Sequence, residues 1–159
     1  MAADRTNRRQ AGPGPELLVE RNLHPDYPLP DVEHPVTRPF WEGCRAGEIR
    51  LQRDRETGQV HWPPKPAYWK GGRLEWFRAS GRGTIYSYVV AHEPFLPALR
   101  HLLPLVLVLV ELEEGPRLVG YLTGGTPAEV QFGQPVRVRF KVLNDRVTLP
   151  VWELATATG

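Results

Sequence analysis

The C-terminal half of the chain predicts a mainly β fold, an antiparallel barrel of the OB type. From Arg73 onward, segments rich in β-branched and aromatic residues alternate with clusters of turn formers, the pattern of successive hairpins. The stretch Thr126-Pro127-Ala128-Glu129 combines a capping box with proline at the first helical position, which predicts one helical turn before the last hairpin. About five or six strands with such a turn outline an OB-type barrel. The predicted hairpins join 74–79 to 84–91, 105–112 to 117–122 and 136–142 to 147–154.

Residues 1–36 are expected to form an extended, proline-rich N-terminal arm. Proline fixes φ, lacks an N–H donor and disfavours helix in the residue before it, and prolines recur through this segment. An arm without its own core is either disordered or laid across another surface. Its apolar residues favour the second arrangement and suggest a partner: Leu17, Leu18, Val19, Leu23, Tyr27, Leu29 and Val32. The polar, arginine-rich segment 1–10 is unlike a signal peptide.

Residues 37–72 are expected to hold a short helix and a small hairpin. Thr37 can cap a helix, Phe40, Trp41 and Cys44 follow at helical spacing, and Gly47 suits the position just past its end. We therefore predict a helix over about 38–46. Beyond it, turn formers between short β-like segments predict a hairpin subdomain rather than a helix, and the barrel occupies 73–159.

Composition excludes several classes of protein. A formal net charge of +2, with 24% charged residues, gives neither the strongly basic surface of a duplex-DNA binder nor an acidic tail. The single cysteine, Cys44, cannot form an internal disulfide and fits a reducing cytoplasm. The longest apolar run, 102–110, is far shorter than the roughly 20 residues of a membrane-spanning helix, so we expect no membrane span. In the alternating segment 136–142, three cations are expected on a solvated face: Arg137, Arg139 and Lys141.

Five short motifs occur in a distinctive order: Pro39-Phe40-Trp41-Glu42-Gly43, Glu48-Ile49-Arg50-Leu51-Gln52-Arg53, Trp62-Pro63-Pro64-Lys65-Pro66, Leu74-Glu75-Trp76 and Ser80-Gly81-Arg82-Gly83-Thr84-Ile85-Tyr86-Ser87-Tyr88. Their series resembles the acyl-CoA-associated family long known as domain of unknown function 35, and the resemblance covers about 38–142. It implies an N-terminal helix, a rubredoxin-like zinc ribbon and a C-terminal OB-fold. It also implies a thiolase-fold partner, since members of the family scaffold such enzymes and help to cover their CoA-binding entrance.

The chain departs from the resembled family at its zinc site. The family's ribbon has two Cys-x-x-Cys pairs, whose four thiolates suit tetrahedral zinc. Counted from the flanking motifs, these four places fall on Asp54, Thr57, Tyr68 and Gly71, so no thiolate remains. Asp54, His61 and Cys44 cannot rebuild a closed site at plausible spacing, and we expect no structural zinc. We expect an aromatic cluster to hold the loop instead, made of Trp62, Tyr68, Trp69 and Trp76.

The sequence contains no convincing catalytic set. Cys44 lacks the surroundings of a nucleophile and is expected to be an inert thiol, buried or partly buried. His92-Glu93 opens a loop after a predicted strand. The pair has three alternative roles: a catalytic base with its carboxylate, interface residues, or a metal site that His92 shares with His101. Arg82 between two glycines is either solvated or in contact with a CoA phosphate. The predicted CoA- or partner-contacting residues are Phe40, Trp41, Arg82 and His92.

The function that these observations favour is a non-catalytic accessory subunit of a thiolase-fold acyl-CoA enzyme. The resemblance leaves the reaction open among an acyltransferase, a condensing enzyme and a steroid side-chain aldolase. We expect no tightly bound cofactor, acyl-CoA shared with the partner, and two copies of this chain per thiolase-like dimer. The alternatives are a single-stranded nucleic-acid-binding OB-fold protein and an independent acyl-CoA enzyme.

Overall fold

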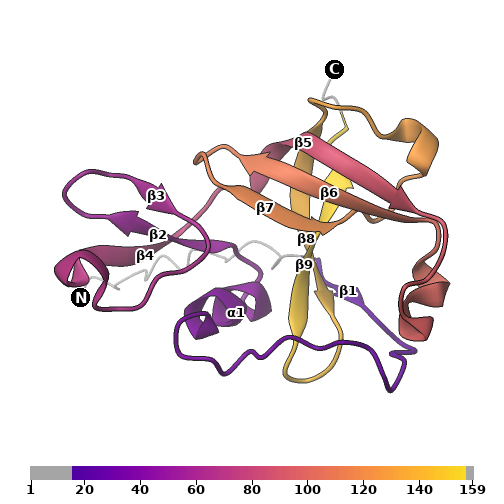
Figure 1. Ribbon diagram of the computed structural model, residues 1–159, viewed down its shortest axis with the longest axis horizontal. Coiled ribbons are helices and arrows are strands. Elements are labelled where there is room, and N and C mark those ends of the chain that lie inside the picture. The colour runs from indigo at the N-terminus through magenta and orange to yellow at the C-terminus, as the bar shows by residue number, and fades with distance from the viewer. Residues whose placement is uncertain (1–15, 157–159) are drawn as a thin grey trace, which may run out of the picture.

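The computed structural model describes residues 16–156 of the chain. The expectation that the N-terminus is no signal peptide, and the first part of the predicted arm, lie outside the described residues. Within 16–156, no helix combines the length and the apolar character that crossing a membrane requires. Two β-sheets and a few short helical segments make up this part of the chain, as the mainly β prediction requires (Figure 1).

A six-stranded sheet curls into the predicted barrel. Its strand order is β1-β8-β5-β6-β7, with β9 also paired to β8. A bridge between Leu122 and Trp152 links the end of β7 to β9. The hairpins predicted for 105–112 with 117–122 and for 136–142 with 147–154 are confirmed. The strands are β1 (Leu18–Val19), β5 (Arg82–Ala91), β6 (Leu105–Leu112), β7 (Arg117–Tyr121), β8 (Pro135–Val142) and β9 (Thr148–Leu154).

The barrel core is built from alternate residues of its strands. In β6, Val108 and Val110 are fully buried, whereas Leu107 and Leu109 point outward and are only partly covered. Trp152 of β9 is also fully buried. A Cβ atom placed on Gly120 would lie 2.9 Å from the indole of Trp152. Only glycine therefore lets β7 approach the largest buried side chain this closely.

A three-stranded sheet forms the hairpin subdomain, called the ribbon below. Its order is β3-β2-β4, where the strands are β2 (Arg50–Asp54), β3 (Val60–His61) and β4 (Leu74–Arg78). The predicted hairpin of 74–79 with 84–91 is wrong, because β4 pairs along its whole length with β2. Between β4 and β5, Gly81 takes a φ of 74° and its carbonyl accepts a hydrogen bond from Val138. This segment therefore crosses from one sheet to the other. The division of the chain at residue 73 stays a prediction.

The predicted helix is present as α1 (Arg38–Arg45), with Ala46 as its C-cap and Gly47 in the left-handed region at φ 77°. Thr37 occupies the N-cap, but its side chain makes no capping bond. Its carbonyl instead accepts the N–H groups of Phe40 and Trp41. The helix buries Phe40 and Cys44 against the ribbon and the barrel, and so joins the two parts.

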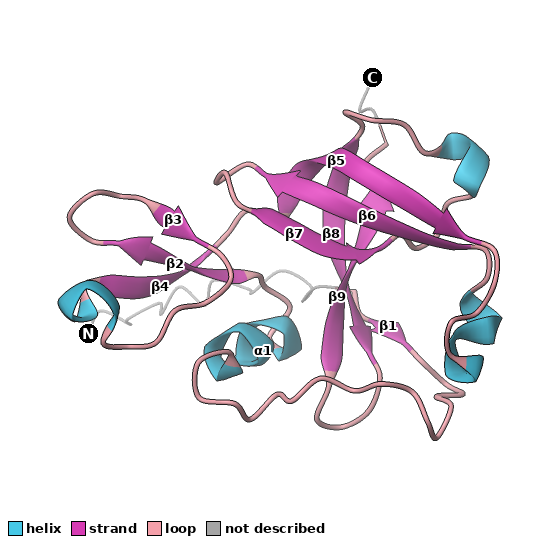
Figure 2. Cartoon of the chain, viewed as in Figure 1, coloured by secondary structure: helices cyan, strands magenta, loops and turns pink. Residues whose placement is uncertain are grey.

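Short 3₁₀ segments complete the secondary structure and appear in cyan with α1 in Figure 2. The predicted helical turn is confirmed as Pro127–Glu129, where the Glu129 carboxylate accepts the Thr126 N–H at 2.7 Å. The other 3₁₀ segments are Trp69–Gly72 and Pro97–Leu102.

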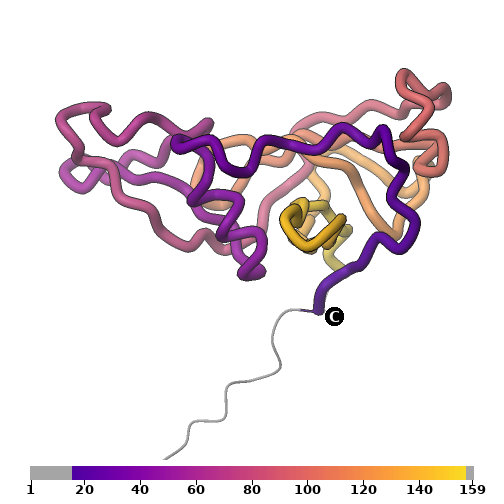
Figure 3. Tube along the Cα trace, turned by 90° about the horizontal axis from the view of Figure 1, so that it is seen from below, coloured from indigo at the N-terminus to yellow at the C-terminus, as the bar shows by residue number. Residues whose placement is uncertain are grey.

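The described part of the N-terminal arm runs along the chain's own barrel (Figure 3). β1 pairs in parallel with β8, and the Glu20 N–H donates to the carbonyl of Val142 at 2.8 Å. The Glu20 carboxylate lies 2.8 Å from Lys141 Nζ. Part of the arm therefore lies on the chain's own barrel, but Leu17, Val19 and Leu29 remain 42%, 61% and 45% exposed. A partner for the arm stays a prediction.

The prediction that the three cations of β8 form a solvated face holds for Arg137, whose side chain is 59% exposed, and is wrong for Arg139 and Lys141. The side chains of Arg139 and Lys141 are only 17% exposed. Arg137 and Arg139 both bond to Glu153 of β9, at 2.8 and 3.1 Å. Neighbouring carboxylates thus pair with all three cations, and two of the three are largely withdrawn from water.

Candidate functional site

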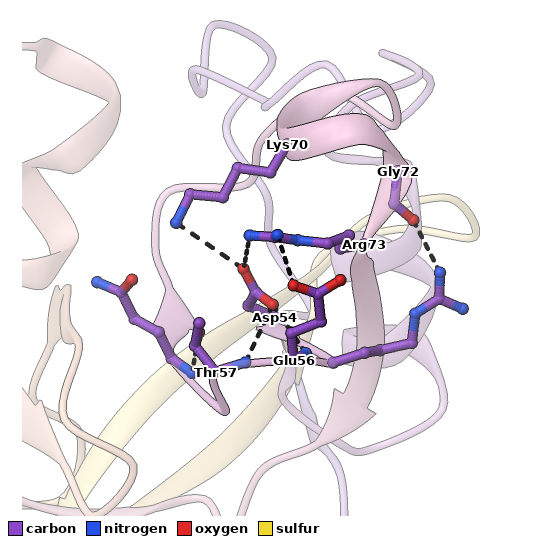
Figure 4. A network of polar contacts seen from close by, with 8 residues as sticks. Asp54, Glu56, Thr57, Lys70, Gly72 and Arg73 are labelled. Carbon is purple, nitrogen blue, oxygen red and sulfur yellow. Dashed lines mark hydrogen bonds and ion pairs between the residues drawn. The ribbon is translucent and has the colours of Figure 1, made fainter.

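Asp54 is the centre of a polar network in the ribbon. It ends β2 at the first of the four positions where the resembled family has cysteine, and its side chain is fully buried. Its Oδ1 atom accepts the N–H groups of Glu56 and Thr57 at 2.9 and 3.2 Å. Its Oδ2 atom lies 2.9 Å from Arg73 Nη2 and 3.8 Å from Lys70 Nζ (Figure 4). The backbone N–H bonds and the guanidinium hold the pKa of Asp54 below its usual range.

Further bonds tie the turn after Asp54 to the turn before β4. Arg73 Nη1 lies 2.7 Å from Glu56 Oε2, so one guanidinium joins two carboxylates. Arg55 donates from its side chain to the carbonyl of Gly72 at 3.0 Å and from its backbone to the carbonyl of Arg73 at 3.1 Å. Each contact bridges the two segments that the family's zinc would join.

The predicted aromatic cluster is not formed. Tyr68 is 81% exposed, and Trp69 is 38% exposed. Trp62 packs instead on Phe40, with ring centroids 4.7 Å apart, and Trp76 contacts the hydrophobic core. Aromatic residues were plausible substitutes by composition, but the backbone directs them away from the centre of the ribbon, which is polar.

The side chains present do not fit structural zinc. Zinc of this class takes four thiolate or imidazole ligands in a tetrahedron. At the four family positions, Asp54 is engaged by N–H groups and cations, Thr57 and Tyr68 are exposed and Gly71 has no side chain. Among residues 16–156, no three or more His, Cys, Asp and Glu side chains are grouped so that they could hold a metal ion.

Cys44 lies on the inner face of α1 and is fully buried in the hydrophobic core. Burial raises the pKa of its thiol to about 12. Because the thiolate is the nucleophilic form, this environment suppresses the reactivity that a catalytic cysteine requires. The geometry therefore agrees with an inert structural thiol.

Arg82 begins β5 and is paired within the chain. Its guanidinium makes two bonds to Glu113, Nε to Oε1 at 2.9 Å and Nη2 to Oε2 at 3.1 Å. This bond holds the pKa of Glu113 below its usual range. Arg82 lines a surface cavity of about 520 Å³ together with Glu111 and Arg137. A phosphate bound by Arg82 has to compete with Glu113.

His92 directly follows β5 and is exposed, as is Glu93. His101 belongs to the 3₁₀ segment Pro97–Leu102, where its Nε2 atom lies 3.8 Å from Glu20 Oε2. The predicted loop position of His92 is therefore correct, while His101 faces the arm. A role for His92 in binding a partner stays a prediction.

The predicted aromatic pair on α1 is divided between core and surface. Phe40 is only 3% exposed and packs edge-on against Trp41 at 5.1 Å. Trp41 is half-buried and lines an apolar groove of about 380 Å³ with Trp62, Val119 and Tyr121. Contact with another molecule is open to Trp41, whereas Phe40 is part of the core.

A second apolar surface was not anticipated from the sequence. The outward side of β5, β6 and β7, called the outer β5–β7 face, carries Tyr86, Val89, Leu107, Leu109 and Val119. Val119 is 64% exposed and pairs with Leu109. Val119 also lines the groove beside Trp41, so the face and the groove are continuous. The run Leu105–Val110 signals such a face, because leucine and valine alternate and leave both sides of the strand apolar.

Comparison with known proteins matches two parts of the chain to domains of one family. Residues 41–67 match the ChsH2 rubredoxin-like zinc ribbon domain, and residues 76–141 match the ChsH2 C-terminal OB-fold domain. A DUF35 domain-containing scaffold protein of Methanothermobacter thermautotrophicus is 30% identical over 57% of this chain and 69% of its own length.

The 3-oxo-4,17-pregnadiene-20-carboxyl-CoA hydratase alpha subunit of Mycobacterium tuberculosis is 39% identical over 89% of this chain. The match spans only 43% of that relative, and it spans 37% of a probable enoyl-CoA hydratase alpha subunit of Thermomonospora curvata. The chain therefore spans less than half the length of each of these two relatives.

Solved structures give the same grouping. A chain of the Ltp2-ChsH2(DUF35) aldolase superposes with a TM-score of 0.71 at 32% identity, covering 80% of this chain and 99% of that one. A DUF35 protein of unknown function from Sulfolobus solfataricus superposes with a TM-score of 0.51 at 12% identity, a likeness of fold alone.

Proposed function

The chain belongs to the ChsH2 family of DUF35 proteins, with a ribbon and an OB-fold domain, and from this premise we propose that it is a non-catalytic accessory subunit of a thiolase-fold acyl-CoA enzyme. The observation that carries the proposal is its likeness to a chain of an Ltp2-ChsH2(DUF35) aldolase, which it covers almost completely. The name scaffold protein, given to archaeal relatives, supports the same role.

The outer β5–β7 face is the proposed contact with the partner. Val89 and Val119 are 58% and 64% exposed, and side chains of this type in a contiguous patch mark interaction sites. Strand β8 differs, because its Lys141–Val142 end pairs with β1 of the arm and its cations are paired with carboxylates. Trp41, beside the same groove, and His92, after β5, are the proposed further contacts.

The rest of the proposal concerns what the complex does. Acyl-CoA is shared with the partner. Arg82 is the proposed contact for a CoA phosphate, which would replace Glu113 as the partner of its guanidinium. Two copies of this chain flank one thiolase-like dimer, in keeping with closed symmetry. The relatives' names favour steroid or other acyl-CoA chemistry, and the fold of this chain does not select the reaction. The cytoplasmic location suggested by one cysteine stays a prediction.

A hydratase role is the second candidate, since two relatives are named hydratase alpha subunits. This chain spans only part of those proteins, so the assay must test hydration of an enoyl-CoA by this chain alone. Single-stranded nucleic-acid binding has less support, because Arg137, Arg139 and Lys141 are bonded to carboxylates and do not form a free basic groove.

The experiment is co-purification of the tagged chain with candidate thiolase-fold proteins of the same organism. We expect a stable complex from the wild type, and loss of at least tenfold in affinity for Val119→Asp, which places a charge within the outer β5–β7 face. Tyr68→Asp is the control, because Tyr68 is also well exposed, at 81%, but lies in the ribbon. Equal binding by both variants would reject this face as the interface, and no binding by the wild type would reject the proposed function.

A further inference from the structure

We infer that an ion-pair network centred on Asp54 does the work of the metal in this ribbon: it joins the two turns that zinc joins in a metal-bearing relative. The network, called the charge clasp below, consists of Asp54, Glu56, Lys70 and Arg73 (Figure 4). The inference concerns the ribbon alone and does not depend on the proposed partner.

The clasp joins the same two segments that a metal joins. Asp54 and Glu56 come from the turn after β2, and Lys70 and Arg73 come from the turn before β4. A zinc ribbon bonds its two turns through one central cation and four thiolates. Here two cationic side chains of the second turn contact the carboxylates of the first. As with zinc, attraction between opposite charges holds the two turns together.

The backbone is arranged for this contact. Lys70 has a φ of 48°, in the left-handed region that a side chain with a Cβ rarely adopts. Gly71 and Gly72 follow at 67° and 78°, so three successive residues are left-handed. This conformation carries Lys70 Nζ over Asp54 and aligns Arg73 with both carboxylates. A lysine held in this conformation indicates that the contact compensates the local strain.

Charge balance explains why the clasp excludes a divalent ion. The carboxylates of Asp54 and Glu56 are matched by the cations of Lys70 and Arg73. The side chain of Asp54 is fully buried, and all the partners of its carboxylate are donors, two backbone N–H groups and two cations. Both oxygens of this buried carboxylate already have partners, so neither is free to bind zinc. A metal ion at this place would also be repelled by the neighbouring guanidinium.

The first test separates metal from charge in the intact chain. Purified protein is analysed for metal content, and its melting temperature is measured with and without EDTA. We expect less than about a tenth of an equivalent of zinc and no shift on chelation, since a structural zinc contributes folding free energy directly. One zinc per chain, lost together with ribbon order on chelation, would overturn the inference.

The second test is a double-mutant cycle on Asp54→Asn and Arg73→Met. Amide exchange of residues 54–58 and 68–73 is expected to accelerate at least about tenfold in each single variant and little further in the double variant, because the partners act as a unit. Arg78→Met is the control, since Arg78 is 74% exposed on β4 and outside the clasp. Additive effects, or an equal effect of Arg78→Met, would contradict the clasp. Lys70→Met, whose contact is longer, serves should Arg73→Met fail to fold.

Discussion

The reactivity of Cys44 gives a sharp prediction, because its environment determines how much thiolate exists. The perturbation is alkylation with iodoacetamide at pH 8, in buffer and in denaturant. In the folded chain the pKa of Cys44 is raised from 9.0 to about 12 by burial. A shift of about three units lowers the thiolate fraction roughly 1,000-fold, and the closed core slows access further.

Mass spectrometry of the alkylated chain over time measures both rates. We expect Cys44 to react at least about 1,000-fold more slowly in the folded chain than in denaturant. A folded-state rate within tenfold of the denatured rate would show that the thiol is neither closed off nor held protonated, and it would make Cys44 a candidate nucleophile again. Cys44→Ala provides the blank for reaction at other side chains.

The same shift predicts a loss of stability at high pH. The thiol of the unfolded chain ionises near pH 9, whereas the buried thiol stays protonated until about pH 12. Between these values the unfolded state has fewer bound protons, so its free energy falls relative to the folded state by about 1.4 kcal/mol per pH unit. In denaturant titrations above pH 9, the free energy of unfolding of the wild type should fall relative to that of Cys44→Ala with that slope. An unchanged difference between the two proteins would contradict the raised pKa.

Three further predictions concern the frame that holds the proposed surfaces. Gly83→Ala should lower the melting temperature by about 4 to 8 °C, because the new Cβ would lie 2.4 Å from the Glu111 carbonyl oxygen in β6; Gly125→Ala, which meets the flexible end of Leu122, should shift it much less. Hydrogen bonding to Lys141 lowers the pKa of Glu20, so this contact stabilises the arm above the carboxyl's ordinary pKa and is lost as the pH falls through the folded value. Limited proteolysis of the arm should become faster at acid pH in the wild type, and Glu20→Gln should show the fast rate already at pH 7. Glu113→Gln frees the Arg82 guanidinium and should tighten binding of CoA to the complex, as measured by calorimetry, whereas unchanged affinity would remove Arg82 from the proposed contacts.

Local signals in the sequence were enough to predict a large part of the fold. The hairpins of β6 with β7 and of β8 with β9, and the capping box at Thr126, depend on neighbours in sequence, and each is present. The pairing of β4 with β2 was missed, because the turn formers at 80–83 look the same in a hairpin and in a crossover between sheets. The pairing of the arm with the chain's own barrel was not predicted, because composition cannot tell which surface an extended segment covers.

In the candidate site, too, features set by local sequence could be predicted and those set by tertiary contacts could not. The loss of the four cysteines and the burial of Cys44 could be predicted from motif spacing and from the helical pattern. The charge clasp could not, since it joins residues that are 19 apart in sequence through the geometry of two turns. A signal was nevertheless present: an acidic residue occupies one lost ligand position, and Lys70 and Arg73 flank another, Gly71.

Reconstitution of activity distinguishes an accessory subunit from an enzyme. The thiolase-fold protein, this chain and their complex are each assayed with acyl-CoA thioesters for thiolysis, condensation, retro-aldol cleavage and enoyl-CoA hydration. An accessory subunit predicts that this chain alone has no activity, that the partner carries the reaction, and that the complex is more active or more stable than the partner alone. Turnover by this chain alone would contradict the account, as would a partner whose activity and stability do not change when this chain is added.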